Sequence, residues 1–82
     1  GEMYLNVAKL LLDKDKFADA KAAAVNARAK GVKKPGDTWS VEARAENSLG
    51  NAAASKAALQ QATKFPETRK WAEAALRQGL AK

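Results

Sequence analysis

Apolar residues recur at helical spacing from the start of the chain. Within residues 3–12, Tyr4, Val7, Ala8 and Leu11 follow the three-and-four spacing of one helix face. Alternating Asp and Lys residues then interrupt the pattern with side chains that suit a turn. The pattern therefore predicts a helix over residues 3–12 that buries this face.

A second run of apolar residues at helical spacing begins at Phe17 and continues through Ala24 and Ala27. Gly31 is placed to end this helix in a left-handed conformation, which glycine adopts without steric cost. A Pro-Gly pair follows shortly afterwards and bars continuation. We therefore expect a linker over residues 31–36.

A third helix is expected over residues 38–49, with Asp37 or Thr38 as its cap. Gly50 follows it at the position where a glycine commonly ends a helix. These features predict a helix that begins after the linker and stops at a second turn.

Two more helices complete the pattern. Asn51 is a favourable cap for a fourth helix, which must stop near Phe65 because Pro66 follows. Pro66 also suits the first turn of a fifth helix, where its missing N–H group costs nothing. That fifth helix would carry Trp71.

Composition supports an all-α fold in a single domain, residues 1–82. Alanine and straight-chain residues favour helix, whereas β-branched and aromatic residues are few. The absence of Cys and His removes disulfides, the usual zinc ligands and most pairings of a nucleophile with a base. No apolar run is long enough to span a membrane. We expect no catalytic residue, metal or cofactor.

The sequence repeats with a period of 35 residues. The matching pairs are Tyr4 with Trp39, Ala8 with Ala43, Asp15 with Gly50, and Ala27 with Ala62. An aromatic residue followed by small residues at such a period resembles the tetratricopeptide repeat. The resemblance implies antiparallel helical hairpins over residues 2–35 and 37–66, with a capping helix over residues 67–81. The small residues Ala8, Ala20, Ala27, Ala43 and Ala62 are expected at close helix contacts.

The second unit departs from this pattern. Glu42 and Glu46 stand where the family usually has large apolar residues, and Ser55 replaces an alanine. Acid–base chemistry or metal binding is one interpretation of the two glutamates, but we favour a polar face paired with Arg44 or Lys56. The large aromatics are expected in packing roles: Phe17, Trp39, Phe65 and Trp71.

A narrower resemblance concerns residues 30–36, Trp39, residues 49–51 and residues 67–70. These segments are similar to the C-terminal part of bacterial tetratricopeptide proteins encoded beside TonB-type genes. That similarity favours the periplasm or cell envelope over the cytoplasm, although the compartment stays open.

Tetratricopeptide hairpins stack into a curved array whose first helices line a concave groove. The resemblance places six residues on that groove: Leu5, Lys9, Leu12, Ser40, Arg44 and Asn47. Lys9 and Arg44 would together hold an acidic group, and Asn47 would bind peptide backbone. The alternative is that these are solvated side chains with no ligand.

The leading functional hypothesis is a non-enzymatic protein-interaction module that binds a peptide or helix of a partner, with no small-molecule substrate. The net charge of +6 motivates one alternative, a basic helical domain that binds nucleic acid. Because opposite charges are interleaved along the chain, that alternative is not favoured. A second alternative is a structural cap of a solenoid.

The first helix is apolar almost all round, since Leu5, Leu10 and Leu12 lie off the predicted stripe. We therefore expect a second surface of this helix to be buried against another helix or another chain. We predict that the chain is the C-terminal end of a longer repeat array. We also predict that the isolated chain self-associates through residues 3–12.

Overall fold

The computed structural model describes residues 2–78 and contains five α-helices in that range. Their bounds are α1 Glu2–Asp13, α2 Phe17–Lys30, α3 Pro35–Ser48, α4 Ala52–Ala62 and α5 Arg69–Gln78. Between residues 2 and 78 there is no β-strand. The predicted all-α fold with five helices is therefore confirmed.

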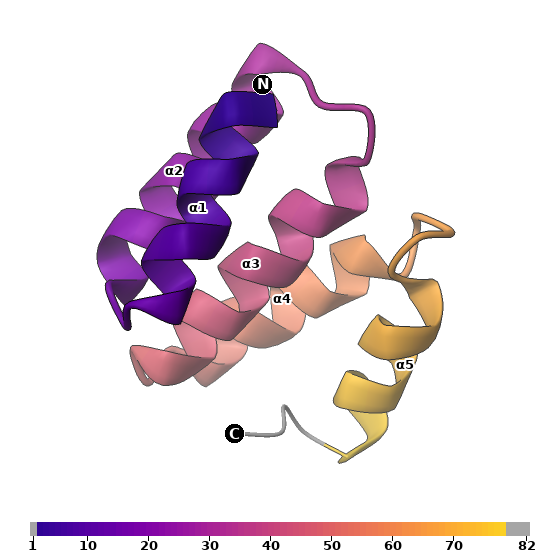
Figure 1. The fold of residues 1–82 in the computed structure, drawn as a ribbon. Helices are drawn as coiled ribbons and strands as arrows, with labels where there is room; N and C mark the ends of the chain where they lie inside the picture. Colours follow the sequence, from indigo (N-terminus) through magenta and orange to yellow (C-terminus); the bar gives the residue numbers. More distant parts are fainter. Residues whose placement is uncertain (1, 79–82) are drawn as a thin grey trace.

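Each helix packs against the next one along the chain. Figure 1 shows α1 and α2 side by side, α3 running alongside this pair, and α4 behind α3. Helix α1 also touches α3, so the first hairpin stacks on the second. Helix α5 closes the far end against α4, and it makes a smaller contact than the helices within each hairpin.

The two hairpin turns have the same backbone structure 35 residues apart. Asp15 has a φ of 60° and Gly50 has a φ of 86°. The hydrogen bonds that close the turns also correspond, from Lys16 N–H to the Leu11 carbonyl (2.9 Å) and from Asn51 N–H to the Glu46 carbonyl (2.8 Å). The internal repeat in the sequence is therefore a repeat of backbone geometry.

The core consists almost entirely of small side chains. The five alanines predicted at close helix contacts, Ala8, Ala20, Ala27, Ala43 and Ala62, are fully buried. One cluster joins α1, α2 and α3, and a second cluster joins α3, α4 and α5. Because alanine projects only a methyl group, the helix backbones can approach closely.

Large aromatic side chains flank this alanine core. Phe17 packs against the first cluster, and Trp39 and Trp71 pack against the second. Phe65 is half-buried in the connection between α4 and α5. The aromatics therefore fill space beside helices that alanine alone would leave open, as the sequence predicted for Phe17, Trp39 and Trp71.

The predicted stripe of α1 is correct for Ala8, which is fully buried, and for Leu11, which packs against the core, but wrong for its other two members. Leu5 is 3% exposed and belongs to the core, and Leu12 is half-buried against it. Tyr4 and Val7, which were expected in the core, are 41% and 43% exposed. Both faces have helical spacing, so periodicity could not decide between them. Leu5, Ala8 and Leu12 form the face that meets α2.

The start of α3 also differs from the prediction. The helix begins at Pro35, inside the expected linker, because proline is compatible with a first helical position. Thr38 does not cap the helix, since its hydroxyl donates to the Pro35 carbonyl at 2.6 Å. Asp37 also lies within the first turn, where its charge suits the positive end of the helix dipole.

The ends of α4 and α5 are likewise displaced. Asn51 precedes α4, but its side chain makes no capping hydrogen bond. Helix α4 stops at Ala62, and α5 begins at Arg69 rather than at Pro66. The Thr68 hydroxyl donates to the Ala62 carbonyl at 2.8 Å, which ties the intervening turn to the end of α4.

Gly36 lies in the first turn of α3 against that same connection. Its N–H donates to Glu67 Oε2 at 2.9 Å. A Cβ atom at this position would lie 2.8 Å from Glu67 Oε2 and 2.9 Å from Phe65 Cβ, and it would also meet the Thr68 hydroxyl. The connection between α4 and α5 therefore depends on a residue without a side chain at this point.

Gly36→Ala should lower the free energy of unfolding by about 1 kcal/mol, as measured by urea denaturation. Helix propensity alone would raise it by about 1 kcal/mol, but overpacking of this contact costs about 1–3 kcal/mol. The sign of the change therefore distinguishes the two effects. An increase in stability would mean that the α4–α5 connection moves away freely.

Candidate protein-binding groove

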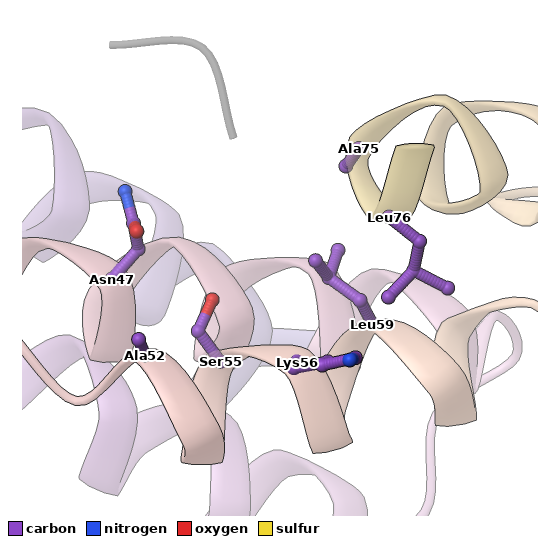
Figure 2. A pocket seen from close by; sticks show the side chains of 7 residues that line it. All are labelled: Asn47, Ala52, Ser55, Lys56, Leu59, Ala75 and Leu76. Atoms are coloured by element: carbon purple, nitrogen blue, oxygen red, sulfur yellow. The ribbon is translucent and has the colours of Figure 1, made fainter. Parts of the chain in front are cut away.

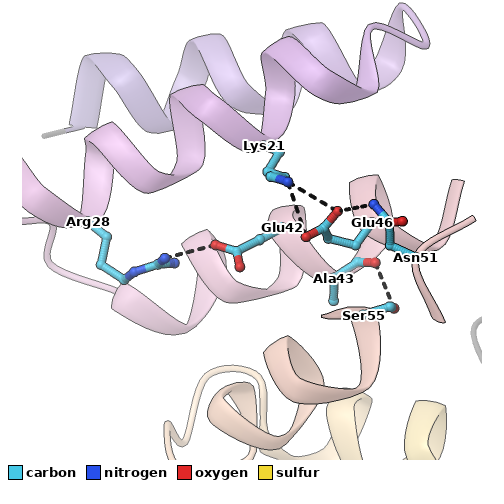
Figure 3. A network of polar contacts seen from close by, with 7 residues as sticks. All are labelled: Lys21, Arg28, Glu42, Ala43, Glu46, Asn51 and Ser55. Atoms are coloured by element: carbon cyan, nitrogen blue, oxygen red, sulfur yellow. Dashed lines mark hydrogen bonds and ion pairs between the residues drawn. The ribbon is translucent and has the colours of Figure 1, made fainter. Parts of the chain in front are cut away.

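The two hairpins are held together by polar side chains of α2 and α3. Arg28 donates to Glu42 Oε1 at 2.8 Å and to the Thr38 hydroxyl at 3.3 Å. Its guanidinium also lies 3.5 Å from the centre of the Trp39 ring. Figure 3 shows the Arg28–Glu42 pair between the two helices. One arginine thus contacts three side chains of α3.

A second ion pair lies nearer the other end of the same interface. Lys21 Nζ is 3.3 Å from Glu46 Oε2, and the Asn51 side chain donates to Glu46 Oε1 at 2.9 Å (Figure 3). Glu46 is only 5% exposed. The predicted partners Arg44 and Lys56 are therefore wrong, because the two glutamates point across to α2. Their arrangement serves the contact between hairpins.

The Ser55 hydroxyl donates to the Ala43 carbonyl at 2.8 Å, which satisfies the polar group that replaces an alanine of the repeat (Figure 3). Throughout residues 2–78, no buried side-chain nitrogen or oxygen atom lacks a hydrogen-bond partner. The polar departures of the second unit are therefore paired within the fold.

Lys9 is paired within the chain. Its Nζ lies 3.7 Å from Asp37 Oδ2, and the two side chains are 51% and 27% exposed. The Ser40 hydroxyl donates to the Asp37 carbonyl at 2.9 Å. Because Asp37 already supplies a carboxylate, the charge of Lys9 is partly neutralised. The sequence predicts Asp37 only as a helix cap and gives no signal of this contact with Lys9.

Arg44 is exposed on the side of α3 that faces α5. Its guanidinium lies 5.2 Å from the centre of the Trp71 ring, which permits a cation–π interaction. Within the described part of the chain, Arg44 makes no ion pair. Its donor groups are therefore available to an acidic ligand.

A cavity of about 230 Å³ lies between the end of α3, α4 and α5, and its lining residue Asn47 is one helical turn after Arg44. It is lined by Asn47, Ala52, Ser55, Lys56, Leu59, Ala75 and Leu76. Figure 2 shows Leu59 of α4 and Leu76 of α5 on either side of its apolar part. Asn47 and Ser55 contribute polar groups at the other part. We refer to the cavity together with Arg44 and Trp71 as the α3–α5 groove.

Of the six residues predicted on the groove, Arg44 and Asn47 lie together, one turn apart on α3. Ser40 is one turn before Arg44, whereas Lys9 is on α1 and paired. Leu5 is excluded because it is buried in the core, and Leu12 packs against that core. Leu59 is 4% exposed and belongs to the second core cluster, and Leu76 packs against it, so the cavity opens onto this cluster. The sequence indicates their core character and gives no signal of the cavity.

Within residues 2–78, no group of three or more acidic, His or Cys side chains is placed to hold a metal ion. In the same range, no helix has the length and apolar character needed to cross a membrane. Comparisons with protein-family models, curated proteins and solved structures find no match for this chain. The candidate site therefore depends on the geometry of the chain itself.

Proposed function

We propose that this chain is a non-enzymatic protein-interaction module, the C-terminal end of a longer repeat protein, and that it binds a peptide segment of a partner in the α3–α5 groove. The observation that supports this proposal is the cavity between α3, α4 and α5, in which Leu59 and Leu76 form an apolar wall and Lys56 is basic. The exposed Arg44 lies one helical turn before the lining residue Asn47. A protein segment with an apolar side chain next to an acidic group complements both features.

The size of the cavity favours a peptide over a small molecule. Its volume of about 230 Å³ is below the roughly 300–1,000 Å³ of typical small-molecule sites. One apolar side chain of a partner would fit against Leu59 and Leu76. Asn47 would donate to or accept from the peptide backbone, and Arg44 would bind an acidic side chain or a terminal carboxylate.

The distribution of charge does not favour nucleic acid as the partner. Lys9, Lys21 and Arg28 are each paired with a carboxylate of the same chain. Binding to phosphates would weaken steeply between about 50 and 200 mM salt, whereas peptide binding in a partly apolar groove would change modestly. Salt dependence therefore separates the two functions.

Reversing two basic charges tests the groove. The probe is a fluorescent peptide selected against the chain from a random library, and its affinity is measured by fluorescence anisotropy. The double variant Lys9→Glu, Arg44→Glu should weaken binding at least about tenfold, since it removes the guanidinium and adds repulsion. Most of the loss should come from Arg44→Glu alone, because Lys9 is already paired with Asp37.

The matched control is the double variant Lys30→Glu, Lys64→Glu. It changes the net charge equally at two exposed positions on α2 and after α4. Circular dichroism should show the same helix content in all variants. Equal affinity of the groove variant and the unaltered chain, or an equal loss in the control, would refute binding at the α3–α5 groove.

A further inference from the structure

The side of α1 that faces away from the core carries four exposed apolar side chains. They are Met3 (77% exposed), Tyr4 (41%), Val7 (43%) and Leu10 (53%). We call these four residues the α1 outer face. Elsewhere between residues 2 and 78, comparably exposed large apolar side chains occur singly, at Val25 of α2 and Leu49 after α3. The α1 outer face is therefore a concentrated apolar surface.

The 35-residue repeat shows what covers the corresponding face in the second hairpin. The positions one period later are Thr38, Trp39, Glu42 and Ala45 of α3. Thr38 and Ala45 are fully buried, and Trp39 and Glu42 are half-buried. Arg28 of α2 contacts the first three of them, and Ala45 lies in the core cluster with alanines of α2. In the second hairpin this face is thus covered by the second helix of the preceding hairpin.

We propose that the α1 outer face is a stacking surface for a further helical hairpin placed before α1 in the same chain. The second helix of that hairpin covers α1 as α2 covers α3, and it is apolar where α2 carries Lys21 and Arg28. This inference rests on the proposed function as the end of a repeat array. It continues an interface that the structure already contains between its two hairpins.

The apolar character of the covering helix follows from the ion pairs of α3. Glu42 and Glu46 receive the basic side chains of α2. One period earlier, α1 has Val7 and Leu11 at these positions. A lysine or arginine brought against them would be desolvated without a carboxylate partner, which is unfavourable. The covering helix therefore needs apolar side chains there.

A second copy of this chain fits the surface less well. The face of α2 that would imitate the covering helix already lies against α3. A second chain would have to use its own α1 outer face. Four side chains of one helix supply only a fraction of the roughly 800 Å² that each partner buries in a stable interface. Self-association through residues 3–12 is therefore expected to be weak and to disappear once the hairpin is present.

The test adds a hairpin to the full chain. A copy of residues 2–35 joined directly before Gly1 preserves the 35-residue period. The unaltered copy keeps its Lys21 and Arg28, and the apolar copy carries Lys21→Leu and Arg28→Leu in the added segment only. Both added segments carry Met3→Glu, Val7→Lys and Leu10→Glu, so that the chain's own Met3 is the single methionine and the added first helix does not present the same apolar face again. Its oxidation by hydrogen peroxide is followed by mass spectrometry.

We expect Met3 to oxidise about tenfold more slowly with the apolar copy than in the 82-residue chain, because a covered thioether is less accessible. The unaltered copy should protect it less. Sedimentation equilibrium should show that the protein with the apolar copy is monomeric. Unprotected Met3 with both copies, or equal protection by both, would overturn the proposal.

A dimer of the chain at low micromolar concentration that persists with the apolar copy would assign the face to a second copy and would also overturn the proposal. The outcome is independent of peptide binding, since the α3–α5 groove shares no residue with the α1 outer face. If Met3 is not protected but the peptide still binds, only this inference fails. If Met3 is protected but the peptide does not bind, only the proposed binding at the α3–α5 groove fails.

Discussion

Replacing Arg28 by alanine should lower the free energy of unfolding by about 2–3 kcal/mol. The substitution leaves the Glu42 carboxylate half-buried without its cation and removes the stacking on Trp39. Breaking a fully buried ion pair costs about 3–5 kcal/mol. We expect a smaller loss of stability here, because the Arg28 and Glu42 side chains are 24% and 16% exposed and so are not fully buried. Urea denaturation followed by circular dichroism measures the change.

Two companion variants identify the source of that loss. Lys30→Ala removes an exposed positive charge from the last turn of the same helix and should change stability by less than about 0.5 kcal/mol. A double-mutant cycle with Glu42→Gln should give a coupling free energy of about 1 kcal/mol or more between Arg28 and Glu42. Additive losses would show that the ion pair contributes nothing beyond packing.

The repeat was the most informative feature of the sequence for the fold. It identified the alanines at the helix contacts and matched Asp15 with Gly50, although these residues differ chemically. Both have positive φ in the structure. The residue types alone predict a positive φ for the glycine, but aspartate adopts a positive φ only occasionally. The 35-residue period indicates that the two turn positions are equivalent, which the two residue types do not indicate by themselves.

Local signals placed the ends of the helices less well. The residue before a proline avoids helical geometry, which predicts that Pro35 belongs to a linker. That constraint acts on Lys34, which stays outside α3, and it leaves Pro35 free to begin the helix. Pro66 posed the same choice, but α5 starts only at Arg69. Pro35 therefore begins a helix, whereas Pro66 lies within the connection between two helices, so proline marked an interruption in both places without fixing where the next helix starts.

The candidate site was harder to predict, because contacts between hairpins decide it. Lys9 and Arg44 are equivalent in the repeat, yet Lys9 meets Asp37 and Arg44 meets Trp71. Glu42 gives no signal in the sequence that its partner is Arg28 on another helix. These pairings depend on how α2, α3 and α5 are oriented, and an alanine-rich pattern leaves that orientation weakly specified.

Ala27→Leu tests this alanine packing directly, and we expect it to lower the free energy of unfolding by about 1–3 kcal/mol. Ala27 is fully buried in the cluster that joins α1, α2 and α3, and its carbonyl accepts the Gly31 N–H that ends the helix. A leucine there must push α1 away or distort the end of α2. Measured losses below a few tenths of a kcal/mol would mean that the two helices are not in tight contact.

The matched control is Ala22→Leu, at an exposed position of the same helix. The two substitutions add the same atoms and have the same small effect on helix propensity, so their difference isolates the packing cost. Composition cannot distinguish the two alanines, since α2 has alanine on its buried and exposed faces alike. The 35-residue pairing does not distinguish them either, since Ala22 pairs with Ala57 as Ala27 pairs with Ala62. The structure does, because Ala27 and Ala62 are fully buried whereas Ala22 and Ala57 are exposed. Equal stability of the two variants would therefore contradict tight packing at Ala27.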